Sequence, residues 1–146
     1  MSKNNAYAVL RARQQEEYNK FPIGAAFNQE QFDKMMIQWG LYPSETDKIV
    51  SLGYGCFIQK KDVQAYHELG IRHAQELKEA FASDTTGTGF VYDAFYYELA
   101  NHEYCITGDL SEAVTACGLD WETVMENPIY DKALRKAADD VLRDSF

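Results

Sequence analysis

The stretch at residues 90–104 carries the polar side chains most suggestive of chemistry. Its candidates are Asp93, Glu98, Asn101, His102 and Glu103, set among six aromatic residues. Glu98 and His102 are four residues apart and share one face of a helix, with Asp93 slightly more than one turn earlier. An imidazole beside a carboxylate serves acid–base catalysis or metal binding. One hypothesis is therefore a metal-binding or acid–base enzyme centred on Glu98 and His102, with Asp93 and Asn101 beside them.

The spacing of these residues limits that hypothesis. The zinc motif of metalloproteases needs two histidines at i and i+4, with a glutamate between them as base. Only His102 is present here, so His67 or His73 on a facing helix would have to complete a ligand set. The alternative is a half-buried polar network in which a carboxylate or carbonyl satisfies His102. We favour this alternative, with Glu98, Asn101 and His102 as internal polar ties, and predict no catalytic residue, metal or cofactor.

Two other chemical patterns are incomplete. Cys105 lies three residues after His102, a spacing that seldom aligns a thiol with its base on one helix. The Gly-Tyr-Gly at 53–55 lacks the third glycine of a dinucleotide fingerprint and the Lys-Ser/Thr of a P-loop. The sequence therefore favours neither a cysteine nucleophile nor a nucleotide site.

Residues 110–125 approximate a helix-turn-helix, with Gly118 at the turn. A DNA reader places the exposed residues of its second helix against phosphates and base edges. The second helix here would expose Asp120, Glu122 and Glu126, which the DNA backbone repels. We predict the helical corner and keep a DNA-binding regulator as an alternative function.

Acidic residues are concentrated in the last forty positions. The predicted partner-binding face consists of Asp109, Glu112, Asp120, Glu122, Glu126, Asp131, Asp139 and Asp140. If these side chains share a face, they would dock on a basic groove of a nucleic-acid enzyme as a mimic of the phosphate backbone. The alternative is an ordinary solvated helical face.

Hydrophobic periodicity predicts the elements that position these residues. Helices are expected over residues 5–20, from an Asn28 N-cap to Gly40, over 62–82 and 90–104, in short segments within 110–126, and over 130–142. Two apolar runs around the Gly-Tyr-Gly turn, within 49–58, predict a β-hairpin. The predicted fold is mainly α: a compact bundle of about six helices around the central aromatic helix, with one small hairpin.

Composition bounds the remaining possibilities. The 146 residues suit a single globular domain, with 107–146 as a possible helical subdomain. The net charge of −9 argues against direct binding to nucleic acid. The cysteines, Cys56, Cys105 and Cys117, are odd in number and lack CxxC spacing, which is typical of a reducing cytosol. Without a signal peptide or a long apolar run, we expect no membrane association and a cytoplasmic location.

Three segments together carry a family resemblance. They are Phe-Pro-Ile-Gly-Ala-Ala-Phe at 21–27, running into Gln31 and Phe32, Gly-Tyr-Gly-Cys-Phe-Ile at 53–58, and Tyr-Glu-Leu-Ala-Asn-His-Glu-Tyr at 97–104. The chain resembles a group of small uncharacterised proteins encoded by phages and prophages of Gram-positive and gut bacteria. The resemblance brings no established activity. It implies a setting, because acidic phage proteins of this size without a catalytic signature often inhibit host defences, as anti-CRISPR proteins do.

These observations lead to one functional expectation. The chain is expected to be a non-enzymatic, acidic, phage-type protein in the cytoplasm of a bacterial host. It would bind and inhibit a host protein, such as a basic nucleic-acid-handling defence complex, through the acidic C-terminal helices.

Overall fold

The computed structural model describes residues 4–146. These residues form eight α-helices and a small three-stranded antiparallel sheet, and 69% of the structure is helical. The predicted mainly α class with a small β element is therefore confirmed.

The chain divides into two compact units. The terminal unit contains the described residues up to Arg13 together with Glu76–Phe146, and the middle unit contains Gln14–Gln75. The boundaries fall inside the two longest helices before residue 90, α1 (Ala6–Lys20) and α3 (Val63–Ser83). Whether the two units fold as one domain stays a prediction.

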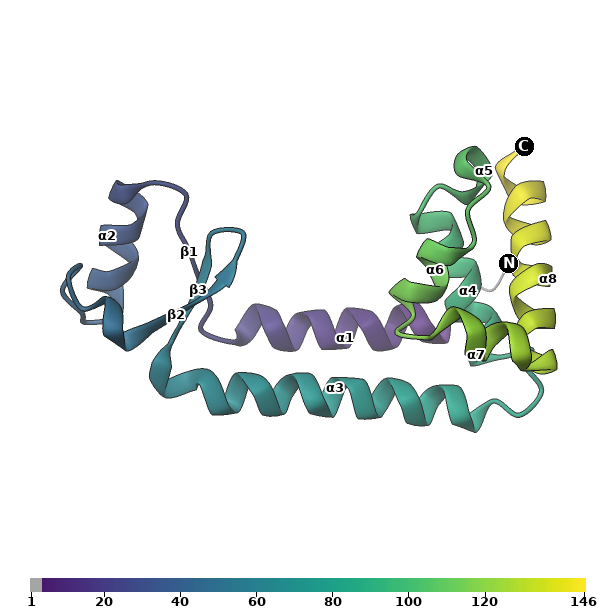
Figure 1. Ribbon diagram of the computed structural model, residues 1–146, viewed down its shortest axis with the longest axis horizontal. Coiled ribbons are helices and arrows are strands. Elements are labelled where there is room, and N and C mark those ends of the chain that lie inside the picture. The colour runs from purple at the N-terminus through teal and green to yellow at the C-terminus, as the bar shows by residue number, and fades with distance from the viewer. Residues whose placement is uncertain (1–3) are drawn as a thin grey trace. The chain divides into compact units, whose positions relative to one another are not determined.

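The terminal unit is built around α4 (Phe90–Asn101). This helix packs most extensively against α8 (Pro128–Ser145) and also contacts α5 (Tyr104–Thr107) and α6 (Ser111–Ala116), while α7 (Trp121–Glu126) packs on α8 (Figure 1). The larger core side chains of this unit are Tyr7, Leu77, Phe81, Val91, Phe95, Leu99, Val114, Val124, Leu134 and Val141. The aromatic helix is thus the centre of this unit.

The helix predicted over 90–104 is shorter in the structure. It ends at Asn101, and α5 starts again at Tyr104. Glu103 between them has a φ of +56°, in the left-handed region that residues other than glycine rarely adopt. A left-handed residue just past a helix end redirects the chain and stops helical hydrogen bonding.

The middle unit contains the sheet, with strand order β1-β3-β2. The predicted hairpin is confirmed as β2 (Ile49–Gly53) and β3 (Cys56–Gln59). Its turn is left-handed throughout, with φ values of +86° at Gly53, +54° at Tyr54 and +76° at Gly55. Glycine tolerates this conformation at no steric cost, which explains Gly53 and Gly55, whereas Tyr54 adopts it as a non-glycine residue. A third strand, β1 (Gly24–Ala25), pairs with β3 and was not predicted.

Helix α2 (Gln29–Gln38) covers the sheet and begins at the predicted cap. The Asn28 side chain accepts the Gln31 amide proton at 2.8 Å, and the Gln31 side chain accepts that of Phe27 at 2.8 Å. Met35 and Met36 on this helix form the buried centre of a second core.

Gly24 allows α2 to approach the sheet. A Cβ atom at this position would collide with the side chain of Met35 and would lie 2.9 Å from the ring of Trp39.

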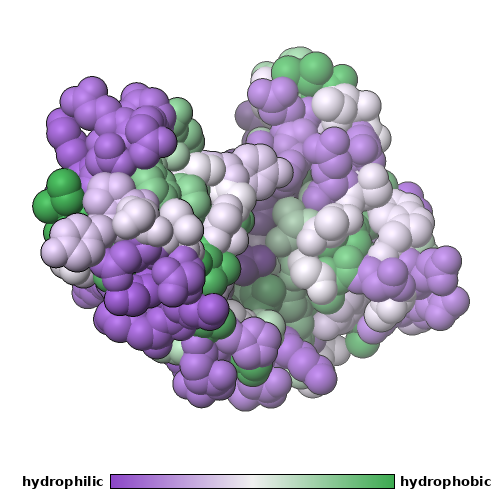
Figure 2. All heavy atoms as spheres, turned by 60° about the vertical axis from the view of Figure 1, so that its left-hand side comes forward, coloured by the Kyte–Doolittle hydropathy of each residue, from purple (hydrophilic) through white to green (hydrophobic). Residues whose placement is uncertain are grey.

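The surface seen in Figure 2 is largely hydrophilic, with hydrophobic residues in scattered patches. Among the described helices, none has the length and apolar character needed to cross a bilayer.

Candidate functional sites

A buried polar network joins α1, α4 and α6 in the terminal unit. The Tyr7 hydroxyl donates to Oε2 of Glu98, and both side chains are buried. Arg11 Nε donates to the Tyr7 hydroxyl at 3.0 Å, and another Arg11 nitrogen donates to the Ala116 carbonyl at 3.0 Å. Because Tyr7 and Arg11 of α1 bond to Glu98 of α4 and to Ala116 of α6, the network fixes how these three helices pack.

The electrostatics of this network oppose nucleophilic chemistry. Burial, followed by the hydrogen bond to Glu98, raises the pKa of Tyr7 well above its usual value. Burial and the charge of Glu98 raise the pKa of Cys117 to about 12. A thiol with this pKa is protonated at neutral pH and is a poor nucleophile. The geometry therefore supports a structural role for Tyr7, Glu98 and Cys117.

The structure brings Glu98 and His102 together but not the other two predicted residues. His102 Nε2 lies 3.6 Å from Oε1 of Glu98, and its Nδ1 lies 3.5 Å from Oε2 of Glu112. Asp93 instead accepts the backbone amide proton of Ala6 at 3.0 Å, at the start of α1. Asn101 is exposed, so its prediction as an internal polar tie is wrong. The four predicted residues do not form one centre.

The histidines suggested as additional ligands have other surroundings. His67 is exposed on α3. His73 is buried in the middle unit, where its Nε2 lies 3.1 Å from Oε1 of Glu17 and its ring packs edge-on against Tyr18.

Most of the predicted acidic face is occupied by internal contacts. Asp109 accepts from the Ser111 backbone and hydroxyl, Asp120 caps α7 through the Thr123 amide, Asp131 pairs with Arg135, and Glu112 faces His102. Asp140 is buried, which corrects its assignment to a partner-binding face. Its carboxylate accepts from the Tyr92 hydroxyl and pairs with Lys136 and Arg143.

Three predicted acidic residues remain available for binding. Glu122, Glu126 and Asp139 are exposed, and the structure gives them no hydrogen bond or ion pair within residues 4–146. Glu122 and Glu126 are four residues apart on α7 and share its face. Between the cap Asp120 and Glu122 stands Trp121, whose side chain is 39% exposed. We call Asp120, Trp121, Glu122 and Glu126 the α7 acidic surface.

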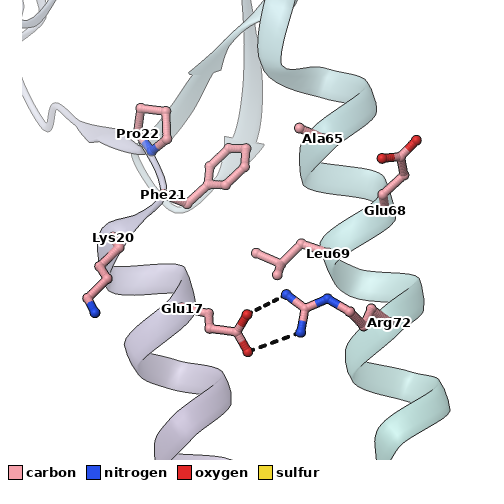
Figure 3. Close-up of a pocket in the computed structure, with 8 residues that line it drawn as sticks. All are labelled: Glu17, Lys20, Phe21, Pro22, Ala65, Glu68, Leu69 and Arg72. Carbon is pink, nitrogen blue, oxygen red and sulfur yellow. Dashed lines mark hydrogen bonds and ion pairs between the residues drawn. The ribbon is translucent and has the colours of Figure 1, made fainter.

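The middle unit contains a groove that sequence reasoning missed. It has a volume of about 610 Å³ and is lined by Glu17, Lys20, Phe21, Pro22, Ala65, Glu68, Leu69 and Arg72 (Figure 3). Glu17 on α1 and Arg72 on α3 form a two-pronged ion pair across it, with one nitrogen–oxygen distance of 3.3 Å. The partners are 55 residues apart and carry no local motif, so no sequence signal pointed to them.

Glu17 should make the stability of the protein depend on acidic pH. The hydrogen bond from Arg72, and secondarily the one from His73, lowers the pKa of Glu17 to about 2 from its ordinary value of 4.5. A carboxyl whose pKa is lower in the folded state stabilises it above the unfolded pKa and loses this effect as pH falls through the folded pKa. We expect Glu17→Gln to destabilise the protein at pH 7 and to have a much smaller effect near pH 2. Urea unfolding of both proteins between these pH values measures the difference.

Glu16→Gln is the matched control for that experiment. Glu16 is its neighbour on α1 and pairs with Lys20 at 3.9 Å on an exposed surface, where ion pairs contribute little. A stability difference between wild type and Glu17→Gln that is the same at pH 7 and pH 2 would contradict the proposed origin of the effect.

Comparison with known proteins assigns the chain to a family. A family model described as "Family of unknown function (DUF7659)" matches residues 6–140. The chain belongs to this family. No curated protein and no solved structure matches the chain.

Proposed function

We propose that this member of the family is a non-enzymatic binding protein of a phage or prophage that blocks a basic protein of its bacterial host. The contact surface in this proposal is the α7 acidic surface. The observation that carries it is the exposed ring of Trp121 on the same short helix as Glu122 and Glu126, two acidic side chains that have no hydrogen bond or ion pair within residues 4–146.

The charge of the terminal unit supports a basic partner. Residues 79–131 contain eleven acidic residues and no lysine or arginine. The whole terminal unit has 15 acidic against 8 basic residues, whereas the middle unit has 8 against 6. A field of one sign attracts an oppositely charged partner over a distance and raises the association rate.

Trp121 supplies apolar contact area, which the acidic charges alone do not provide. Tryptophan is enriched among the few residues that carry most of the energy of a protein interface, where an acidic rim adds specificity and speed. A protein that handles nucleic acid presents a basic groove, because it must neutralise phosphates. An acidic surface with an aromatic anchor fits such a groove. The resemblance of segments 21–27, 53–58 and 97–104 to phage proteins favours a host defence complex as the partner that contains this groove.

The structure favours this proposal over the two alternatives. A helix-turn-helix regulator needs a recognition helix that tolerates phosphates, and α7 is six residues long and exposes Glu122 and Glu126. An acid–base or metal centre needs the Glu98 carboxylate, which already accepts a hydrogen bond from the Tyr7 hydroxyl in a buried network.

Charge reversal on α7 tests the proposal. The first step is to capture the partner from host lysate at low salt, to identify it and to purify it. We expect the double change Glu122→Lys and Glu126→Lys to weaken its binding about tenfold or more, equivalent to about 1.4 kcal/mol. Binding of the wild type should weaken as salt rises, and DNA should compete for the partner. Surface plasmon resonance gives each dissociation constant.

The control carries the same charge change on the middle unit. Glu30→Lys with Asp47→Lys alters two exposed acidic residues outside the proposed surface. The proposal fails if this control weakens binding as much as the α7 variant, or if salt and DNA have no effect on a partner that the wild type retains.

A further inference from the structure

The terminal unit contains a cavity of about 210 Å³ that the proposed function does not use. It lies where the loop before α4 meets α8, and it is lined by Thr86, Gly87, Thr88, Tyr92, Ile129, Lys132, Ala133, Lys136 and Asp140. The volume falls below the roughly 300 Å³ at which drug-sized pockets begin, so only a small ligand would fit.

The loop side of the cavity is held in one conformation by Asp84. One carboxylate oxygen accepts the amide proton of Gly87 at 3.0 Å, and the other accepts those of Gly89 and Val91 at 3.0 Å each. The loop also sits tightly on α8, since a Cβ at Gly87 would lie 2.7 Å from Cγ2 of Ile129. The cavity is therefore a formed feature rather than a gap beside a loose loop.

The polar lining offers donors for an anion. The Thr86 hydroxyl donates to Oδ1 of Asp84 at 3.2 Å, so the Thr88 hydroxyl, 2.7 Å from it, is the one whose hydrogen can rotate toward a new acceptor. Lys132 and Lys136 stand four residues apart on α8 and so project from the same face. Lys136 is partly neutralised, because its Nζ lies 3.1 Å from Oδ2 of Asp140.

Lys132 has no such neutralising contact. The structure gives its ammonium group no hydrogen bond or ion pair within residues 4–146. Two lysines against Asp140 give the lining residues a formal charge of +1, within a terminal unit whose charge is −7. The nearby Asp84 carboxylate is not part of the lining and accepts the amide protons of the loop. The remaining lining includes the apolar side chains of Ile129 and Ala133. The cavity thus combines a local positive charge with an apolar wall.

From this combination we propose that the cavity binds a small phosphate monoester. Lys132 and the Thr88 hydroxyl hold the phosphate oxygens, and the organic group packs on Ile129 and Ala133. The lysine supplies charge and the hydroxyl supplies direction, which together suit the several acceptor oxygens of a phosphate. The groove of the middle unit is a poorer anion site, because its arginine already holds the Glu17 carboxylate.

Nuclear magnetic resonance of the full chain tests the proposal with phenyl phosphate as the probe. We expect saturable shifts of the backbone amides of residues 86–89 and 132–136. Inorganic phosphate, which lacks the ring, and benzoate, which lacks the phosphate, should each bind several-fold more weakly. Lys132→Gln should raise the dissociation constant about tenfold, because it removes a charged hydrogen-bond donor, and Thr88→Val should raise it a few-fold.

Lys78→Gln is the matched control, since Lys78 is an exposed lysine of the same unit outside the cavity. It should leave the dissociation constant unchanged. The proposal is overturned if phenyl phosphate causes no saturable shifts, or if Lys78→Gln weakens binding as much as Lys132→Gln. Equal binding of benzoate or of inorganic phosphate would also overturn it, by removing the need for the phosphate or for the apolar wall. Unchanged urea midpoints for the exposed-lysine variants confirm that they remain folded.

Discussion

Replacing Tyr7 with phenylalanine should lower the free energy of unfolding by about 2–3 kcal/mol. The change keeps the ring but removes the hydroxyl that donates to the buried Glu98 carboxylate and accepts from Arg11. A buried charged group that loses its hydrogen-bond partner costs more than the roughly 1 kcal/mol of an average hydrogen bond. Since the total free energy of unfolding of a domain of this size is about 5–15 kcal/mol, this loss is a large fraction of it. Urea unfolding followed by circular dichroism measures it.

Tyr97→Phe is the control for this change. The rings of Tyr97 and Tyr7 pack 5.6 Å apart, but Tyr97 is 39% exposed and its hydroxyl makes no hydrogen bond within residues 4–146. Removing the Tyr97 hydroxyl should lower the free energy of unfolding by less than about 0.5 kcal/mol, as for most surface changes. If both variants lose the same stability, the polar network is not what Tyr7 contributes.

The sequence predicted elements well where the signal was local. The Asn28 cap, the Gly-Tyr-Gly turn and the central position of the aromatic helix each depend on residues close together in the chain, and each is present. Strand β1 was missed because its two residues, Gly24 and Ala25, have low strand propensity and pair only because β3 lies beside them. The early end of α4 was missed because a left-handed glutamate has no sequence signature.

The candidate sites were harder still to predict from the sequence, because they depend on contacts between residues that are distant in the chain. Acidic residues can be counted from the sequence, but their partners cannot. Asp140 looked like a surface charge, yet Tyr92 from another helix reaches it and α8 supplies two cations to it. The cavity beside Lys132 depends on a loop whose shape is set by three backbone contacts to Asp84. Such contacts come from tertiary packing, which a pattern of residue types does not encode locally.

Phe95→Ala should have the largest effect of any single change considered, a loss of about 3–5 kcal/mol. Phe95 is fully buried in the middle of α4, and its ring packs edge-on against Tyr130 of α8. Removing the ring loses the free energy gained by moving it from water into the core, and it leaves a cavity that the surrounding helices fill only in part. Ile106→Ala, at a residue that is 77% exposed, should cost less than about 0.5 kcal/mol.

The two tryptophans allow the effect to be followed in each unit. Trp121 reports on the terminal unit and Trp39 on the middle unit, so Phe95→Ala is best made in two backgrounds, Trp39→Phe and Trp121→Phe. We expect the urea midpoint of the Trp121 signal to fall by more than about 1 M. An unchanged Trp121 midpoint would contradict the role of α4 as the centre of its unit.

The Trp39 signal in the same experiment decides how the units are coupled. A midpoint that falls together with that of Trp121 would mean that the chain unfolds as a single cooperative domain. A midpoint that stays in place would mean that the middle unit, with its own core around Met36, is stable without the terminal unit. Because α1 and α3 supply residues to both units, loss of the terminal core should fray these helices. We therefore expect the two midpoints to fall together.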